Sequence, residues 1–142
     1  MQDADVKPET ANLNEILVPI SPGELLDKIT ILRIKAARMS DAAQLANVRG
    51  ELSRLEATWH AAVPADAHLG ADERALEHVN AQLWDIEDRI RDHEAGSRFD
   101  REFIELARAV YLNNDERAAI KKRINVVLKS SLIEEKSYRP YR

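Results

Sequence analysis

Residues 21–39 read SPGELLDKITILRIKAARM, and this stretch decides how the rest of the chain must pack. Ser21 suits the N-cap of a helix, Pro22 suits its first position, and Glu24 follows the cap by three residues, as in a capping box. From Leu25 onward apolar residues recur at spacings of 4, 3, 4 and 3, which is the helical period. The stretch therefore predicts an α-helix that begins directly after Ser21.

The same helix has a second apolar face. Ile31 and Ile34 lie roughly 120–180° around the helix axis from the first seam. A helix that is apolar on two sides is expected between two layers, either inside a bundle or at a subunit interface. We expect a homodimer formed through this face. The alternative is that later helices of the same chain cover it.

Two longer helices are predicted to follow. Asp41 can cap a helix that reaches about residue 60, and a third helix is expected over residues 72–94. Both have apolar seams with alternating spacings of 3 and 4. Because the loop between them is short and contains Pro64, we expect the two helices to form an antiparallel hairpin.

The C-terminal third predicts two more helices and a tail. Asp100 can cap a fourth helix, and Asn113-Asn114-Asp115 is expected to form a turn before a fifth. No strand-like alternation persists anywhere. The predicted fold is thus an all-α helical bundle of about five helices built around a long antiparallel hairpin. Residues 1–15 are expected to form a flexible arm, and residues 16–142 a single helical domain.

The composition narrows the class of protein. The 142 residues are 44% hydrophobic and include no cysteine, and no apolar run approaches the ~20 residues that cross a bilayer. We expect a cytoplasmic protein without a membrane segment. Residues 1–115 carry a net charge of −9 and residues 116–142 one of +5. A basic C-terminal segment on an otherwise acidic chain favours an anionic partner or self-association. The acidic overall charge argues against nucleic acid as that partner.

Motifs of established enzymes are lacking. The chain contains no glycine-rich phosphate loop, no His-Glu-x-x-His and no cysteine nucleophile. Asp85, Asp88 and Asp92 share one helical stripe, where paired carboxylates could hold Mg²⁺. Because Arg89 and Arg91 stand beside the stripe, we expect a solvated charged face with no metal, and we expect no cofactor.

Two groups of polar residues are candidates for ligand or partner binding. The first decorates the two-faced helix and could bind an anion: Glu24, Asp27, Lys28, Arg33 and Lys35. The second joins the expected turn to the tail: Tyr111, Asn114, Asp115, Glu135, Lys136 and Tyr138. The plainer alternatives are charges that extend into solvent beside buried seams, a helix-capping turn, and a tail that closes the bundle.

The tail itself carries a definite expectation. Residues 132–141 include two large aliphatic side chains and two tyrosines, so we predict that this segment packs against the bundle. Apolar burial alone would not offset the loss of backbone entropy. The prediction therefore requires buried tyrosines and at least one paired glutamate, with Arg33 or Arg123 as the expected partner.

Several blocks of sequence resemble an uncharacterised bacterial family, a domain of unknown function. The blocks are VPISPGELLDKITIL at residues 18–32, LANV at residues 45–48, YLNND at residues 111–115 and EEKSY at residues 134–138. The resemblance covers roughly residues 16–141. It implies a small helical protein whose relatives often lie near glycosyltransferase and surface-polysaccharide genes, and it implies no established activity.

These observations favour a non-enzymatic accessory or interaction protein, linked through the resemblance to cell-surface polysaccharide biosynthesis. The alternative is an enzyme or binding protein for a phosphorylated or sugar-nucleotide anion. A concave polar pocket between the first and last helices would favour the alternative. A flat apolar groove would favour the interaction protein.

Overall fold

The computed structural model describes residues 14–142, which form four α-helices and no strand within that range. The helices are α1 (Pro22–Arg38), α2 (Ala42–Ala62), α3 (Gly70–Ala95) and α4 (Arg101–Val127). The predicted all-α bundle built around a long antiparallel hairpin is confirmed, with four helices where about five were expected. Residues 1–13 of the predicted N-terminal arm lie outside the described residues.

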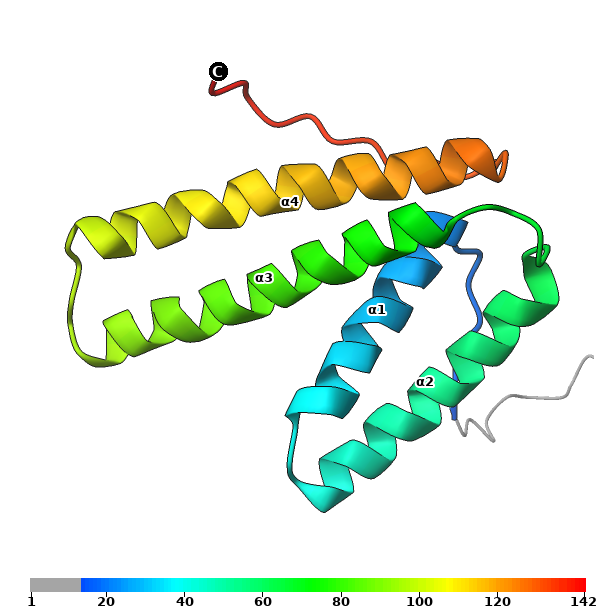
Figure 1. The fold of residues 1–142 in the computed structure, drawn as a ribbon, viewed down its shortest axis with the longest axis horizontal. Helices are drawn as coiled ribbons and strands as arrows, with labels where there is room; N and C mark the ends of the chain where they lie inside the picture. The colour runs from blue at the N-terminus through cyan, green and yellow to red at the C-terminus, as the bar shows by residue number, and fades with distance from the viewer. Residues whose placement is uncertain (1–13) are drawn as a thin grey trace, which may run out of the picture.

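The long hairpin is made by α3 and α4, and not by the second and third helices as expected. Figure 1 shows α3 and α4 side by side, with α1 and α2 forming a second hairpin that meets one end of the first. Among the described helices, α2 packs mainly on α1, whereas α1 also contacts α3 and α4. The reason is that the seam of α3, at Leu76 and Val79, packs into a core with Leu26, Ile120 and Ile124 from α1 and α4.

Three of the expected helix starts are confirmed by their caps. The side chain of Ser21 accepts from the backbone N–H of Glu24 at 3.2 Å. Asp41 and Asp100 cap α2 and α4 in the same way, at 2.9 and 3.1 Å. Each oxygen satisfies one of the backbone donors that a helix start leaves open.

The expected turn at residues 113–115 is wrong, because α4 runs through it without a break. Asn113 donates to the carbonyl of Ala109 at 2.8 Å, one turn earlier in the helix. Asn114 accepts from Arg117 at 2.9 Å, and Asp115 accepts from Tyr141 at 2.5 Å. These side chains therefore bond along the helix or to the tail and do not compete for its backbone.

The start of α1 lies directly on α4. The backbone N–H of Gly23 donates to Oδ1 of Asn125 at 2.7 Å, across 102 residues of sequence. A Cβ atom at this glycine would lie 2.5 Å from the carbonyl oxygen of Lys121. The missing side chain thus allows the close approach that brings the polar face of α1 against α4.

The second apolar face of α1 is covered largely within the chain. Ile34 is 8% exposed, and Ile31 is half-buried at the edge of a cavity formed with α3 and α4. The reason for expecting a dimer through this particular face therefore no longer holds.

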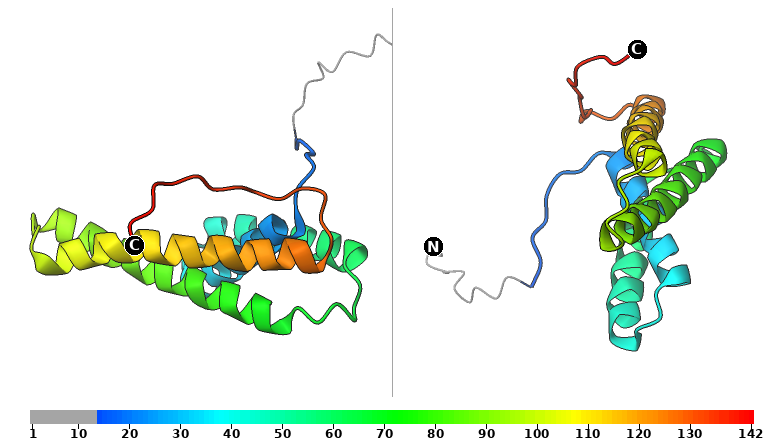
Figure 2. Two further views of the ribbon diagram at one scale, coloured as in Figure 1. Left: turned by 90° about the horizontal axis from the view of Figure 1, so that it is seen from above. Right: turned by 90° about the vertical axis from the view of Figure 1, so that its left-hand side faces the viewer.

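The C-terminal segment, residues 130–142, turns back after α4 and returns along it as extended chain, as Figure 2 shows. We call this segment the strap. None of the described helices is long and apolar enough to span a bilayer.

Candidate functional site

A cavity of about 560 Å³ lies between α4 and the strap. We call it the strap cavity. The residues that line it come from one stripe of α4 and from the strap: Tyr111, Asn114, Asp115, Arg117, Ala118, Lys121, Lys136, Tyr138, Arg139 and Tyr141. Four of these side chains carry a positive charge and one carries a negative charge, so the lining is cationic.

The strap is held on α4 by contacts at the two ends of the strap cavity. Near the C-terminus the hydroxyl of Tyr141 donates to Asp115 at 2.5 Å, which raises the pKa of the tyrosine above its ordinary value. The ring of Tyr141 also meets Tyr111 edge-on, with centroids 4.8 Å apart. Nearer α4's end, Glu135 pairs with Lys122 at 3.1 Å.

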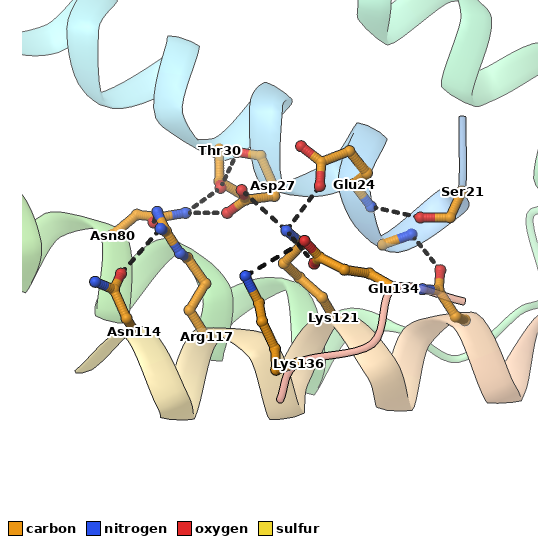
Figure 3. A network of polar contacts seen from close by, with 12 residues as sticks. Ser21, Glu24, Asp27, Thr30, Asn80, Asn114, Arg117, Lys121, Glu134 and Lys136 are labelled. Atoms are coloured by element: carbon orange, nitrogen blue, oxygen red, sulfur yellow. Dashed lines mark hydrogen bonds and ion pairs between the residues drawn. The ribbon is translucent and has the colours of Figure 1, made fainter. Parts of the chain in front are cut away.

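Lys121 forms the centre of a cluster of carboxylates at the side of the cavity (Figure 3). Its amine lies 2.7 Å from Glu24, 3.9 Å from Asp27 and 3.2 Å from Glu134, and its side chain is 12% exposed. Burial disfavours the charged amine, but the three carboxylates outweigh this and raise the pKa of Lys121. The charge of Lys121 is therefore already balanced.

Glu134 joins the strap to this cluster. Its hydrogen bond with Lys121 lowers the pKa of Glu134, and Lys136, at 3.4 Å, lowers it further. Figure 3 shows that α1, α4 and the strap converge on this point. An ionised Glu134 thus stabilises the docked strap.

A buried asparagine connects the cluster to a third helix. Asn80 of α3 is 4% exposed, and its amide donates to Asp27 at 2.8 Å and to the hydroxyl of Thr30 at 3.0 Å. Its carbonyl oxygen accepts from Arg117 at 3.1 Å. Both the amide nitrogen and the carbonyl oxygen of Asn80 are thereby bonded where α1, α3 and α4 meet.

Arg117 differs from Arg33 and Lys121, two other half-buried cations. Its guanidinium donates to the amide oxygens of Asn80 and Asn114, at 3.1 and 2.9 Å. Within residues 14–142 no carboxylate oxygen lies within 4.0 Å of it, whereas Arg33 and Lys121 are each surrounded by three. Arg117 is thus held in a fixed orientation while its charge stays unbalanced.

A second cavity, of about 440 Å³, lies on the other side of Arg117. It has an apolar wall from Ile31, Leu83, Trp84 and Val110. Asn114 and Arg117 line both cavities, so this arginine stands between them.

The structure brings together most of the second group of predicted residues. Tyr111, Asn114, Asp115, Lys136 and Tyr138 all line the strap cavity. Glu135 lies beside it, paired with Lys122. From the first group, Glu24 and Asp27 join this region through Lys121.

The remaining predicted residues lie elsewhere. Lys28 is exposed and Lys35 is half-buried, and neither lines a cavity described above. Arg33 pairs with Glu56 at 3.1 Å and with Glu73 at 2.5 Å, which ties α1 to α2 and α3. Its surroundings are those of a structural ion pair.

Four residues of the site were not predicted: Asn80, Arg117, Lys121 and Arg139. Arg117 and Lys121 follow Asn114 by three and seven residues, which is the spacing of one helix face. This signal was hidden because a turn was expected at residues 113–115. Asn80 carried no signal, since a single asparagine in a helix of mixed polarity has no distinguishing context.

The expectation for the tail is correct in one part and wrong in another. Glu134 and Glu135 are paired as required, although with Lys121 and Lys122, while Arg123 pairs with Asp72 at 3.2 Å. Burial of the tyrosines is wrong, because Tyr138 is 76% exposed and Tyr141 is about half exposed.

The carboxylates that form the stripe on α3 do not share one environment. Asp85 pairs with Arg38 of α1 at 2.5 Å, and Asp88 lines the second cavity. Among residues 14–142 no group of three His, Cys, Asp or Glu side chains is placed to share a metal ion.

A family model with the description "Family of unknown function" (DUF6165) matches residues 16–141, the range over which the sequence blocks extend. No curated protein and no solved structure matches the chain.

Proposed function

We propose that this chain, which belongs to the family of unknown function DUF6165, is a binding protein for a small phosphorylated anion. The ligand would occupy the strap cavity. The observation that carries the proposal is the unbalanced charge of Arg117 in the wall of that cavity.

The surroundings of Arg117 suit an anion. A guanidinium has five N–H donors in one plane, and the two asparagine oxygens account for two of them. Amide oxygens orient the group without neutralising it, so a phosphate can accept from the remaining donors in a bidentate manner. Because the side chain is half-buried, the interaction is less screened than on an exposed surface.

The opposite wall adds positive charge. Lys136 and Arg139 extend from the strap, and the carboxylate that lines the cavity, Asp115, already accepts from the hydroxyl of Tyr141. In a chain with a net charge of −4 this is a local reversal of sign. Such a reversal inside a concavity attracts anions.

The shape of the site supports the anion-binding function over the interaction role. The cavity is concave and polar, as the anion-binding alternative requires, although the strap rather than α1 forms its second wall. The proposal is for binding and assigns no reaction. A sugar nucleotide is one member of the proposed ligand class.

Calorimetric titration with pyrophosphate tests the proposal. We expect the full chain to bind it, and Arg117→Gln to weaken binding at least about tenfold, as the loss of charge-assisted hydrogen bonds requires. Arg108→Gln is the matched control, because it removes the same charge from the opposite, exposed face of the same helix. Absence of binding, or an equal loss in both variants, would overturn the proposal.

One observation favours the accessory role as a second candidate. Ile16, Leu17 and Val18 are all more than 60% exposed, in extended chain just before α1. Three consecutive apolar side chains in solvent suit contact with a protein partner. The link to bacterial surface-polysaccharide assembly rests on the family resemblance. A partner retained by the wild-type chain and lost with Leu17→Asp would support this role, and equal retention would count against it.

A further inference from the structure

Tyr138 lines the strap cavity but does not hold the strap in place. The strap is fixed by Glu134, Glu135 and Tyr141, each of which bonds to a side chain of α4. Tyr138 is 76% exposed, and the amine of Lys136 lies 5.8 Å from the centroid of its ring. An aromatic ring at the edge of a cavity, with a face left uncovered, can stack against a planar ligand.

Tyr141, three residues further along the strap, shows the contrast. Its hydroxyl donates to Asp115 and its ring packs on Tyr111, so both the polar and the apolar parts of the side chain are in use. Tyr138 has neither kind of contact among the described residues. The strap therefore carries one tyrosine that anchors it and one that faces the cavity without a structural partner.

The positive charges indicate how many anionic groups the ligand carries. Lys121 is balanced by its three carboxylates, and Lys136 shares Glu134 with it. Arg117 and Arg139 have no carboxylate within 4.0 Å in residues 14–142, and they stand on opposite walls of the cavity. One phosphate for each guanidinium gives a diphosphate.

The cavity is larger than a ligand made only of phosphate requires. Its volume of about 560 Å³ falls within the ~300–1,000 Å³ typical of sites for ligands of drug or cofactor size. A diphosphate fills only part of a cavity of this volume, and Tyr138 lines the same cavity. The combination of cations with an exposed aromatic ring is the chemistry that proteins use for phosphate and base together.

We infer that the ligand of the strap cavity is a nucleoside diphosphate, or a molecule that contains one, with its base stacked on Tyr138 and its phosphates between Arg117 and Arg139. This inference rests on the proposed function and names the class of ligand. It makes the base, and not the phosphates alone, part of what the site recognises.

Titration of the full chain with ADP and, separately, with pyrophosphate tests the inference. We expect ADP to bind about tenfold or more tightly than pyrophosphate, which corresponds to stacking of one base. Tyr138→Ala should abolish this difference, so that ADP then binds no more tightly than pyrophosphate. Tyr138→Phe, which keeps the ring, should preserve it.

Results that contradict the inference can be told apart from results that contradict the proposed function. Equal binding of ADP and pyrophosphate to the wild-type chain, or an equal loss of both in Tyr138→Ala, would overturn the inference and leave the phosphate site standing. No binding of either probe would overturn the proposed function itself. Tighter binding of a 5′-phosphorylated trinucleotide than of ADP would overturn the assignment to a free nucleotide in favour of a nucleic-acid end. Because Tyr138 is exposed, its variants should fold, and an unchanged melting curve confirms that they do.

Discussion

At Gly23 the backbone of α1 approaches α4 so closely that a side chain has no room. A Cβ atom there would lie 2.5 Å from the carbonyl oxygen of Lys121 and 2.9 Å from Oδ1 of Asn125. We predict that Gly23→Ala lowers the free energy of unfolding by about 1–3 kcal/mol, because α1 must move away from backbone that cannot yield. Urea denaturation followed by circular dichroism measures the change.

Gly50 provides the control for this prediction. It lies within α2, and a Cβ atom there meets nothing within 4 Å. Gly50→Ala should therefore raise the free energy of unfolding by about 0.5–1 kcal/mol through helix propensity alone. If both substitutions stabilised the protein, the close contact between α1 and α4 would be contradicted.

Asn80 is the residue through which α3 connects the ion cluster on α1 to Arg117. We predict that Asn80→Leu lowers the free energy of unfolding by about 1–3 kcal/mol, since Asp27 and Thr30 lose a buried donor. It should also weaken pyrophosphate binding, because Arg117 loses one of the two oxygens that orient it. A substitution that destabilises the fold and leaves binding intact would separate Asn80 from the site.

The sequence predicted the helix caps correctly because a cap depends on neighbouring residues. Ser21, Asp41 and Asp100 each bond to a backbone N–H three positions later. Asn80 and Arg117 are separated by 37 residues, so their contact depends on how α3 lies on α4. No local pattern contains that information, and for this reason Asn80 was missed.

At the scale of elements, the strap owes its position mainly to charge. Leu132 and Ile133 are more than 40% exposed, so their burial contributes little, whereas Glu134 bonds to Lys121. The lowered pKa of Glu134 means that its contribution is complete above its ordinary value of 4.5 and is lost as the pH falls through the lower folded value. The raised pKa of Lys121 places the corresponding alkaline loss above 10.5.

We therefore predict that the strap detaches in acid before the helices unfold. Nuclear magnetic resonance spectra recorded from pH 7 down to pH 3 should show the amide signals of residues 132–142 moving together toward random-coil positions while those of α3 and α4 persist. Glu24 and Asp27 also face Lys121 and Lys136 also faces Glu134, so the transition will be broad. Glu134→Gln should show the detached signals already at pH 7. Strap signals that stay fixed in this variant would contradict the electrostatic origin of docking.

The boundaries of the first three helices were predicted well, whereas the pairing of the helices and the continuity of α4 were not. The spacing of apolar residues located the helical segments. Because this spacing is alike in the second and third helices, it does not indicate which helices pack against each other. Asn113-Asn114-Asp115 was assigned to a turn because these residues favour turns locally. In α4 their side chains form hydrogen bonds with Ala109, Arg117 and Tyr141. Tyr141 lies 26 residues after its partner, Asp115.

At the scale of the molecule, the long hairpin extends well beyond the helices that support it (Figure 1). Between residues 84 and 112 just two side chains are buried, His93 and Leu106. Phe99 and Ile104 are more than half exposed in this stretch. Two helices without a third layer bury too little apolar surface to be stable alone. We therefore expect a second copy of the chain to pack against this end of the hairpin.

We predict a homodimer that uses the far end of the hairpin and not the face of Ile31. Light scattering at micromolar concentration should give a mass of twice the 16.1 kDa chain. Ile104→Glu should return the mass to that of one chain, while Leu17→Glu, at an even more exposed apolar position outside the hairpin, should not. A wild-type mass of 16.1 kDa would contradict the prediction.

The contact between Gly23 and Asn125 also has a consequence for the order in which the protein acquires its structure. The partners are 102 residues apart, so α1 leaves the ribosome long before the part of α4 that it needs has been made. At about 5–20 residues per second, the apolar seam of α1 waits on the order of 5–20 s for its partner. During that interval α2, and later α3, are the neighbours available to shelter it. The shorter hairpin thus acts as a holding structure for the nascent chain, and the contact that closes the native fold forms among the last.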